Sequence, residues 1–152
     1  TYSRALVTGA TSGIGEAFAR ALPPETALLL TGRDADALAA LAAELARPGR
    51  AVDTVAADLS ADAGLDALGA AAAAFGPDLL VCNAGQGPFG DFLEAEEAAL
   101  RSTVAVNVLA PLVLLRRLRQ SDAVCRPCMI ERGKRASRIR NCAASRSVCS
   151  PR

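Results

Sequence analysis

Apolar and polar segments alternate along the first 119 residues in a way that predicts strands separated by helices. Alanine- and leucine-rich stretches with helical spacing end at proline or glycine steps, because proline lacks the N–H that would continue a helix. Such alternation implies a doubly wound, Rossmann-like α/β fold with a parallel sheet and right-handed crossovers. The predicted strands are 5–7, 27–31, 51–56 and 78–82, and the predicted helices are 16–22, 35–46, one ending at Phe75 and one from about 92 to 119.

Polar residues mark several of the predicted helix ends. Asp34 is a candidate N-cap for the second helix, and Ser60 or Asp62 for the third. Pro111 interrupts the long last helix. It cannot donate to the carbonyl of Asn107, so we expect a kink there.

Residues 8–15 (TGATSGIG) lie directly behind the first strand and predict a phosphate-binding turn. A glycine-rich turn that opens a helix offers free N–H groups and a positive dipole end to an anionic pyrophosphate. Gly9 allows a tight turn, Gly13 a close approach of backbone to phosphate, and Gly15 close packing of helix on strand. The alternative is a glycine-rich turn with no ligand. The other candidate binding residues in the turn are Thr8, Thr11, Ser12 and Ile14.

The turn resembles the TGxxxGIG cofactor loop of the short-chain dehydrogenase/reductase family, and three further motifs extend the resemblance to about residue 119. Asp58-Leu59 looks like the family's acidic position that contacts adenine, and Asn83-Ala84-Gly85 looks like its NAG motif, which lines the cofactor pocket. Asn107 matches the asparagine of the family's long fifth helix. Taken singly, these residues also fit a helix cap, a tight turn and a solvated polar residue. The resemblance implies hydride transfer between a nicotinamide and a carbonyl or alcohol, and a strand order of 3-2-1-4.

The residues that end the second predicted strand favour NADP over NAD. An acid there would accept hydrogen bonds from the ribose hydroxyls of NAD, but this sequence has Arg33. A guanidinium pairs with a 2′-phosphate that an acid would repel. The alternative is an ordinary surface arginine.

The catalytic residues that the resemblance implies are incomplete in these 152 residues. The family uses asparagine, serine, and the tyrosine and lysine of a YxxxK motif. Here the only tyrosine is Tyr2 and the only lysine is Lys134, so no YxxxK exists, and Ser145 is a weak candidate for the serine. Asn107 is the one candidate catalytic residue that fits the pattern. We therefore expect an oxidoreductase by ancestry that has no turnover as this chain, acting as a dinucleotide-binding module or being an inert fragment.

Composition and charge divide the chain at about residue 120. Residues 1–119 carry nine arginines against fourteen acids, net −5, whereas residues 120–152 carry eight basic residues against two acids, net +6. All twenty leucines precede residue 120. We interpret 1–119 as an incomplete NAD(P)-binding domain and 120–152 as a non-homologous or disordered tail from a frameshift. The alternative is a zinc or nucleic-acid-binding extension using Cys125, Cys128, Cys142 and Cys149.

The remaining expectations concern environment and partners. Histidine is absent, which excludes histidine bases and histidine metal sites, and we expect no metal. No uninterrupted apolar run approaches the ~20 residues that span a bilayer, so the default is a cytoplasmic protein without membrane or nucleic-acid partners. The resemblance implies homo-oligomers that pair through the long helices, with part of that interface missing here. We also expect the fourth strand to be an exposed, aggregation-prone edge.

Overall fold

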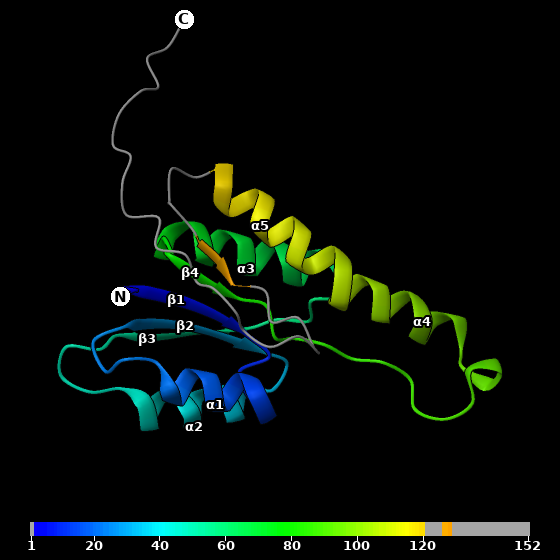
Figure 1. Ribbon diagram of the computed structural model, residues 1–152, viewed down its shortest axis with the longest axis horizontal. Coiled ribbons are helices and arrows are strands. Elements are labelled where there is room, and N and C mark those ends of the chain that lie inside the picture. The colour runs from blue at the N-terminus through cyan, green and yellow to red at the C-terminus, as the bar shows by residue number, and fades with distance from the viewer. Residues whose placement is uncertain (1, 121–125, 129–152) are drawn as a thin grey trace, which may run out of the picture.

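One parallel β-sheet carries helices on both of its faces (Figure 1). The structure is a computed structural model, and it describes residues 2–120 and 126–128. The predicted α/β fold with alternating strands and helices is confirmed. The elements are β1 Arg4–Thr8, α1 Gly13–Ala21, β2 Ala27–Gly32, α2 Ala35–Leu45, β3 Val52–Ala56, α3 Asp62–Phe75, β4 Leu79–Val81, the 3-10 turn η1 Phe92–Glu94, α4 Glu97–Val104, the π-helical segment η2 Ala105–Leu109, α5 Ala110–Gln120 and β5 Arg126–Cys128.

The strands lie in the order β3-β2-β1-β4-β5, so the predicted order 3-2-1-4 is confirmed for the first four. β5 adds a fifth, in which Cys128 pairs with Val81 of β4. The prediction that β4 forms the bare edge of the sheet is wrong over these three residues. Pairing uses main-chain N–H and C=O groups, which Arg126 and Cys128 supply in full and Pro127 only as a C=O. Side-chain composition was therefore a poor guide to whether this segment pairs.

Both faces of the central strands are buried, and this explains their continuous apolar sequence. Ala5 and Val7 of β1 point into a core with α1 and α2, whereas Leu6 points into a second core with α3 and α5. Successive side chains of a strand alternate between the faces of the sheet. A strand covered on both faces must therefore be apolar at every position. β3 is covered less completely, and its Asp53 and Thr54 are exposed.

Two of the predicted helix caps have different outcomes. The carboxylate of Asp34 accepts a hydrogen bond from the backbone N–H of Ala37 at 2.9 Å, which confirms Asp34 as the N-cap of α2. The N-cap position of α3 is Ala61, so the prediction of Ser60 or Asp62 is wrong. Ser60 instead donates both its backbone N–H and its hydroxyl to the carboxylate of Asp58. The polar residue before the helix closes a local turn rather than capping the helix.

The expected kink at Pro111 takes the form of a π-helical segment, η2, between α4 and α5. Its backbone signature is the bond from the N–H of Ala110 to the carbonyl of Ala105, five residues back. Pro111 cannot donate to the carbonyl of Asn107, and the wider π turn accommodates that loss without ending the helix. The helical run therefore continues through the proline.

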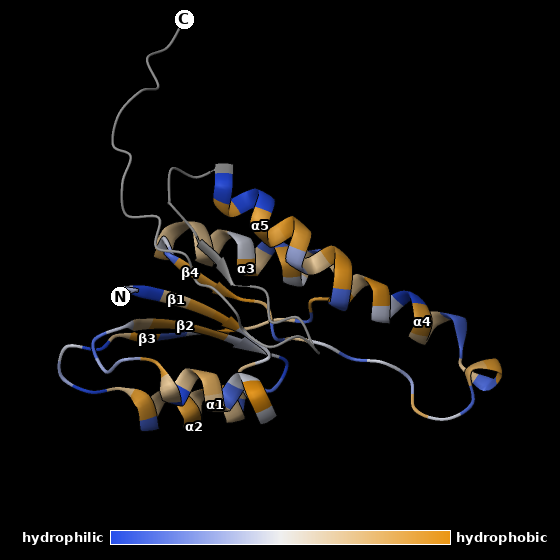
Figure 2. Cartoon of the chain, viewed as in Figure 1, coloured by the Kyte–Doolittle hydropathy of each residue, from blue (hydrophilic) through white to orange (hydrophobic). Residues whose placement is uncertain are grey.

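By length and composition, the helical run Glu97–Arg119 could cross a membrane, since an 18-residue window within it has a mean hydropathy of 1.8. This differs from the expectation based on uninterrupted apolar runs, because the few polar residues here are spaced along the helix. The same run is amphipathic, and Ala110, Leu114 and Leu118 are buried against α3 and the sheet. Figure 2 shows apolar residues along its middle and hydrophilic residues toward both ends. One helix of this length and composition is weak evidence for a membrane span, and 17% of the apolar window is buried in the fold.

Candidate functional site

The glycine-rich turn connects the carboxyl end of β1 to α1, where its conformation requires glycine at two positions. Gly9 has φ +64° and Gly13 has φ +55°, in the left-handed region that favours glycine. A Cβ on Gly9 would lie 2.8 Å from the Cα of Ala84. A Cβ on Gly15 would overlap the carbonyl oxygen of Gly9 and the side-chain amide of Asn83. Close packing of the helix on the turn is thus the physical role of Gly15.

α1 begins at Gly13 with its amino end at the turn, and its first N–H groups have no carbonyl partners within the helix. Ser12, the N-cap, has an extended backbone, and its side chain makes no capping bond with any described residue. Beside Gly13, no described atom lies within 4 Å of the place that a Cβ would take. This end of the helix can therefore accept an anion on backbone donors and a serine hydroxyl.

Thr8 and Asn83 hold the turn against the end of β4. The hydroxyl of Thr8 accepts from the backbone N–H groups of Asn83 and Ala84, both at 3.0 Å, and donates to the carbonyl of Val81. The side-chain amide of Asn83 donates to the carbonyl of Gly9 at 3.1 Å. Thr8 is also buried, at 2% exposure. Both side chains therefore bond to the backbone at the ends of β1 and β4, and neither lines the pocket described below.

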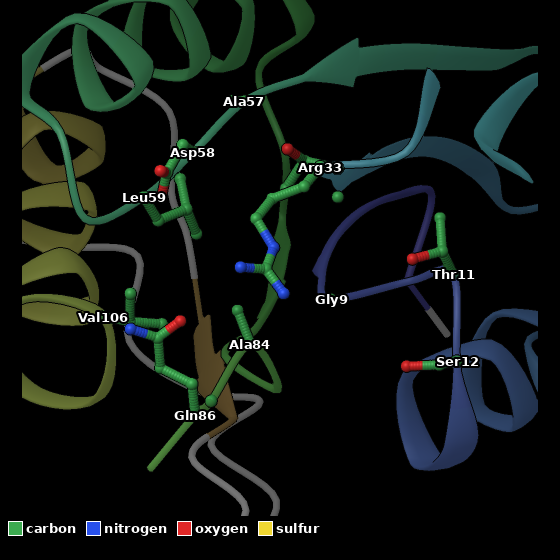
Figure 3. A pocket seen from close by; sticks show the side chains of 13 residues that line it. Gly9, Thr11, Ser12, Arg33, Ala57, Asp58, Leu59, Ala84, Gln86 and Val106 are labelled. Carbon is green, nitrogen blue, oxygen red and sulfur yellow. The ribbon is translucent and has the colours of Figure 1, made fainter. Parts of the chain in front are cut away.

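A pocket opens at the carboxyl ends of the strands, above this framework (Figure 3). It brings together eight of the thirteen predicted binding residues, and its wall leaves out the other five and the one candidate catalytic residue. The eight are Gly9, Thr11, Ser12, Arg33, Asp58, Leu59, Ala84 and Gly85. Those outside the lining are Thr8, Gly13, Ile14, Gly15, Asn83 and the candidate catalytic Asn107.

Five further residues line the pocket that were not among the predicted binding residues: Thr31, Gly32, Ala57, Gln86 and Val106. Gly32, Ala57 and Gln86 are each next in sequence to a predicted binding residue. That adjacency is the sequence signal that could have found them. Val106 lies in the long helical run, where only the fold brings it beside the pocket. Gly32 has a spatial role as well, because a Cβ there would lie 3.0 Å from the side chain of Thr11.

Arg33 and Asp58 supply the charges of the pocket. Figure 3 shows the guanidinium of Arg33 reaching into the space between the glycine-rich turn and the segment of Asp58 and Leu59. The backbone N–H and then the hydroxyl of Ser60, both donating to the carboxylate, hold the pKa of Asp58 below its usual value. The positive charge of Arg33 acts in the same direction, against an opposing effect of burial. Asp58 is therefore an ionised acceptor at neutral pH.

Asn107 lies in the π-helical segment, and its side chain is hydrogen-bonded to the loop after β4. Its Oδ1 accepts from the backbone N–H of Gln86 at 2.9 Å, and its Nδ2 donates to the carbonyl of Gln86 at 2.8 Å. The side chain of Gln86 donates in turn to the hydroxyl of Ser102 on α4. These bonds tie the 84–87 loop to the helical run beside the pocket.

The single tyrosine of the sequence does not lie at this pocket. Tyr2 precedes β1, at the amino edge of the sheet, whereas the pocket lies at the carboxyl edge. Lys134, Ser145 and three of the four tail cysteines, Cys125, Cys142 and Cys149, lie outside the described residues. Among residues 2–120 and 126–128, no three acidic or cysteine side chains are close enough to hold a metal ion together.

Comparison with known proteins gives consistent matches. The sequence profile described as short chain dehydrogenase matches residues 3–131. Nodulation protein G of Rhizobium sp. (strain N33) is 41% identical over 121 residues, which are 78% of this chain and 48% of that protein. The chain thus spans about half the length of this curated relative.

Solved structures are similar over the same part of the chain. One is a metagenomic short-chain oxidoreductase in complex with NADP, with 38% identity and a TM-score of 0.71 over 78% of this chain and 56% of that one. Another is a short-chain dehydrogenase from Sphingobium yanoikuyae in complex with NADPH, with 33% identity and a TM-score of 0.67 over 76% and 47%.

Proposed function

The chain belongs to the short-chain dehydrogenase family of oxidoreductases, and we propose that its pocket binds NADP(H) without catalysing hydride transfer in these 152 residues. The observation that carries the cofactor assignment is Arg33, whose guanidinium lies in the pocket at the end of β2. A guanidinium there pairs with a 2′-phosphate. The NADP and NADPH complexes of two similar structures support the same assignment.

The residues present fit a dinucleotide along the length of the pocket. The amino end of α1 and the hydroxyls of Thr11 and Ser12 suit the pyrophosphate, since backbone donors and a helix dipole favour anions. Space beside Gly13 leaves the backbone there open to a phosphate. The ionised carboxylate of Asp58 can accept from the amino group of an adenine that lies between the apolar side chains of Leu59 and Val106.

When bound, NADPH supplies a hydride. A carbonyl that receives a hydride also needs a proton, and in this family a tyrosine assisted by a lysine transfers it. Tyr2 lies at the opposite edge of the sheet from the pocket, and the sequence offers no second tyrosine. The side chain of Asn107 bonds both backbone groups of Gln86, and a neutral amide is not a proton donor for the reaction. Binding without turnover follows from this set of residues.

Two measurements on the whole chain test the proposal. Titration with NADPH, followed by the fluorescence of the reduced nicotinamide, should saturate, and titration with NADH should give weaker binding. Incubation with NADPH and a panel of ketones and aldehydes should leave the reduced-nicotinamide absorbance unchanged. The absence of NADPH binding would refute the cofactor assignment, and a falling absorbance would refute the lack of turnover.

We also propose that two copies of the chain pair through the exposed side of the helical run 97–119. Four apolar side chains are about half exposed on it: Val104, Val108, Leu109 and Leu112. Acidic residues lie at its amino end and arginines at its carboxyl end. An antiparallel arrangement of two such helices, which a two-fold axis perpendicular to them generates, would cover the apolar side chains and place opposite charges together.

A further inference from the structure

Gln86 makes three hydrogen bonds to the helical run beside it, and only one of them uses its side chain. Its backbone N–H and C=O are both bonded to the side chain of Asn107. The backbone pair alone therefore holds the loop in place. The bond from Nε2 of Gln86 to the hydroxyl of Ser102 fixes the orientation of the carboxamide.

A carboxamide has a donor end and an acceptor end on one rigid plane. Because Ser102 holds the nitrogen, the oxygen Oε1 must face the other way. In Figure 3 the nitrogen of Gln86 points toward the helical run and the oxygen points toward the side of the pocket where Arg33 lies. Within the described residues, no hydrogen-bond donor is assigned to this oxygen. A half-buried acceptor is thus presented to the pocket.

The part of the pocket around this oxygen is chemically distinct from the glycine-rich turn. Leu59 and Val106 give it apolar surfaces, and Asp58 gives it a second acceptor. Apolar surfaces with acceptors at the rim suit a flat base and sugar that carry N–H and O–H donors. The anionic groups of a ligand would instead lie at the amino end of α1 and at Arg33.

We infer that Gln86 is a specificity-determining residue, whose Oε1 accepts a hydrogen bond from the adenosine half of the cofactor, and that Ser102 is the positioning residue that turns this oxygen into the pocket. The inference rests on the proposed binding of NADP(H). The donor on the ligand is the amino group of adenine or the 3′-hydroxyl of its ribose. Both are neutral donors that an amide oxygen can accept from.

Binding measurements with cofactor analogues test the inference. Gln86→Met keeps the length of the side chain and removes both polar ends, and it should weaken NADPH binding about 2- to 10-fold, the effect of one lost neutral hydrogen bond. Ser102→Ala should act in the same direction by releasing the carboxamide. Thr103→Val is the matched control, because the hydroxyl of Thr103 is bonded to the carbonyl of Ala99 within its own helix, and it should bind NADPH as the unmodified chain does.

Deamino-NADPH and 3′-deoxy-NADPH identify the donor. The analogue that lacks it should lose more affinity relative to NADPH on the unmodified chain than on Gln86→Met, since any bond from the same group to Asp58 is lost equally in both. A loss in Gln86→Met that is the same for NADPH and both analogues would show a merely structural effect and overturn the inference, as would unchanged affinity for NADPH. Either result leaves the proposed function standing. An unmodified chain that does not bind NADPH would overturn the proposed function itself.

Discussion

One hydroxyl group, that of Thr8, accepts hydrogen bonds from the backbone N–H groups of both Asn83 and Ala84 at 3.0 Å. It joins the carboxyl ends of β1 and β4, and the two bonded residues Thr8 and Asn83 are 75 positions apart in the sequence. Thr8→Val, which has nearly the same shape, should lower the free energy of unfolding by about 1–3 kcal/mol because two N–H groups lose their acceptor. Denaturant unfolding measures this. Thr8→Ser should recover most of the loss, and Thr54→Val on the exposed side of β3 should change little.

Arg33 should decide the choice between the two nicotinamide cofactors. Arg33→Ala removes a charged partner of the 2′-phosphate, so NADPH should bind about 10- to 100-fold more weakly, while NADH binding should hardly change. Arg33→Asp should go further and favour NADH, because a carboxylate accepts from ribose hydroxyls. Fluorescence titration with both cofactors measures the ratio. Arg47→Ala, an exposed arginine outside the pocket, serves as the control; an equal loss for both cofactors in Arg33→Ala would contradict the assignment.

Gly15 and Gly13 should respond differently to the same added methyl group. Gly15→Ala overlaps backbone of the turn, so the unfolding free energy should fall by about 3 kcal/mol or more, since the backbone has to shift. Gly13→Ala meets open space but keeps φ +55°, and it should cost about 1–2 kcal/mol. Gly87→Ala in the loop after β4 should be close to neutral. Similar losses in Gly13→Ala and Gly15→Ala would show that steric contact is not the cause.

The carboxylate of Asp58 should make stability depend on pH in the acid range. Its pKa is lower in the folded chain than the ordinary value of 3.8, through the two bonds from Ser60 first and then Arg33. Its contribution is therefore fully present above pH 3.8 and is lost as the pH falls through the folded pKa. Ser60→Ala removes the hydroxyl bond and should raise the pKa of Asp58 toward the ordinary value, which an NMR titration of its carboxyl carbon detects. An unchanged titration would contradict the role of that hydroxyl.

The exposed side of the helical run should govern association. Val108→Glu combined with Leu112→Glu places charge in the middle of the proposed two-fold interface, so a dimer should dissociate to monomers. Sedimentation velocity measures the distribution. Leu93→Glu is the control, because Leu93 is 88% exposed but lies in the η1 turn, outside the proposed interface. A chain that is monomeric before any substitution would contradict the pairing.

The sequence was sufficient for the first four strands, most helix ends and the glycine-rich turn, because those depend on periodicity and on local backbone chemistry. It was insufficient for the hydrogen bond by which Thr8 and Asn83, two of the candidate binding residues, join the ends of β1 and β4. That bond depends on β1 and β4 being neighbours. Val106 and Gln86 were missed as lining residues for the same reason: the helical run folds back over the loop after β4.

Pro111 predicted where the long helix is irregular, but it did not predict that the irregularity is a π-helical segment. The loss of one donor at Pro111 can be met by a kink, by an end of the helix or by a wider turn, and only packing selects among them. Here the helix must keep Ala110, Leu114 and Leu118 on the core side beyond the proline. The π-helical segment meets both requirements.

The π-helical segment also makes the helical run sensitive to its number of residues. A π turn holds one residue more than an α turn, so it resembles a single-residue insertion that the helix has absorbed. Deleting Val108 would let the run close into an ordinary α-helix with α4 and α5 in nearly the same relative orientation, because a five-residue π turn and a four-residue α turn cover nearly the same rotation, and only the residues within η2 would change their positions around the helix axis. Asn107 would then turn away from Gln86, although every residue at both ends of their contact would be unchanged. The alignment of this loop with its helix is thus set by chain length as well as by side-chain identity.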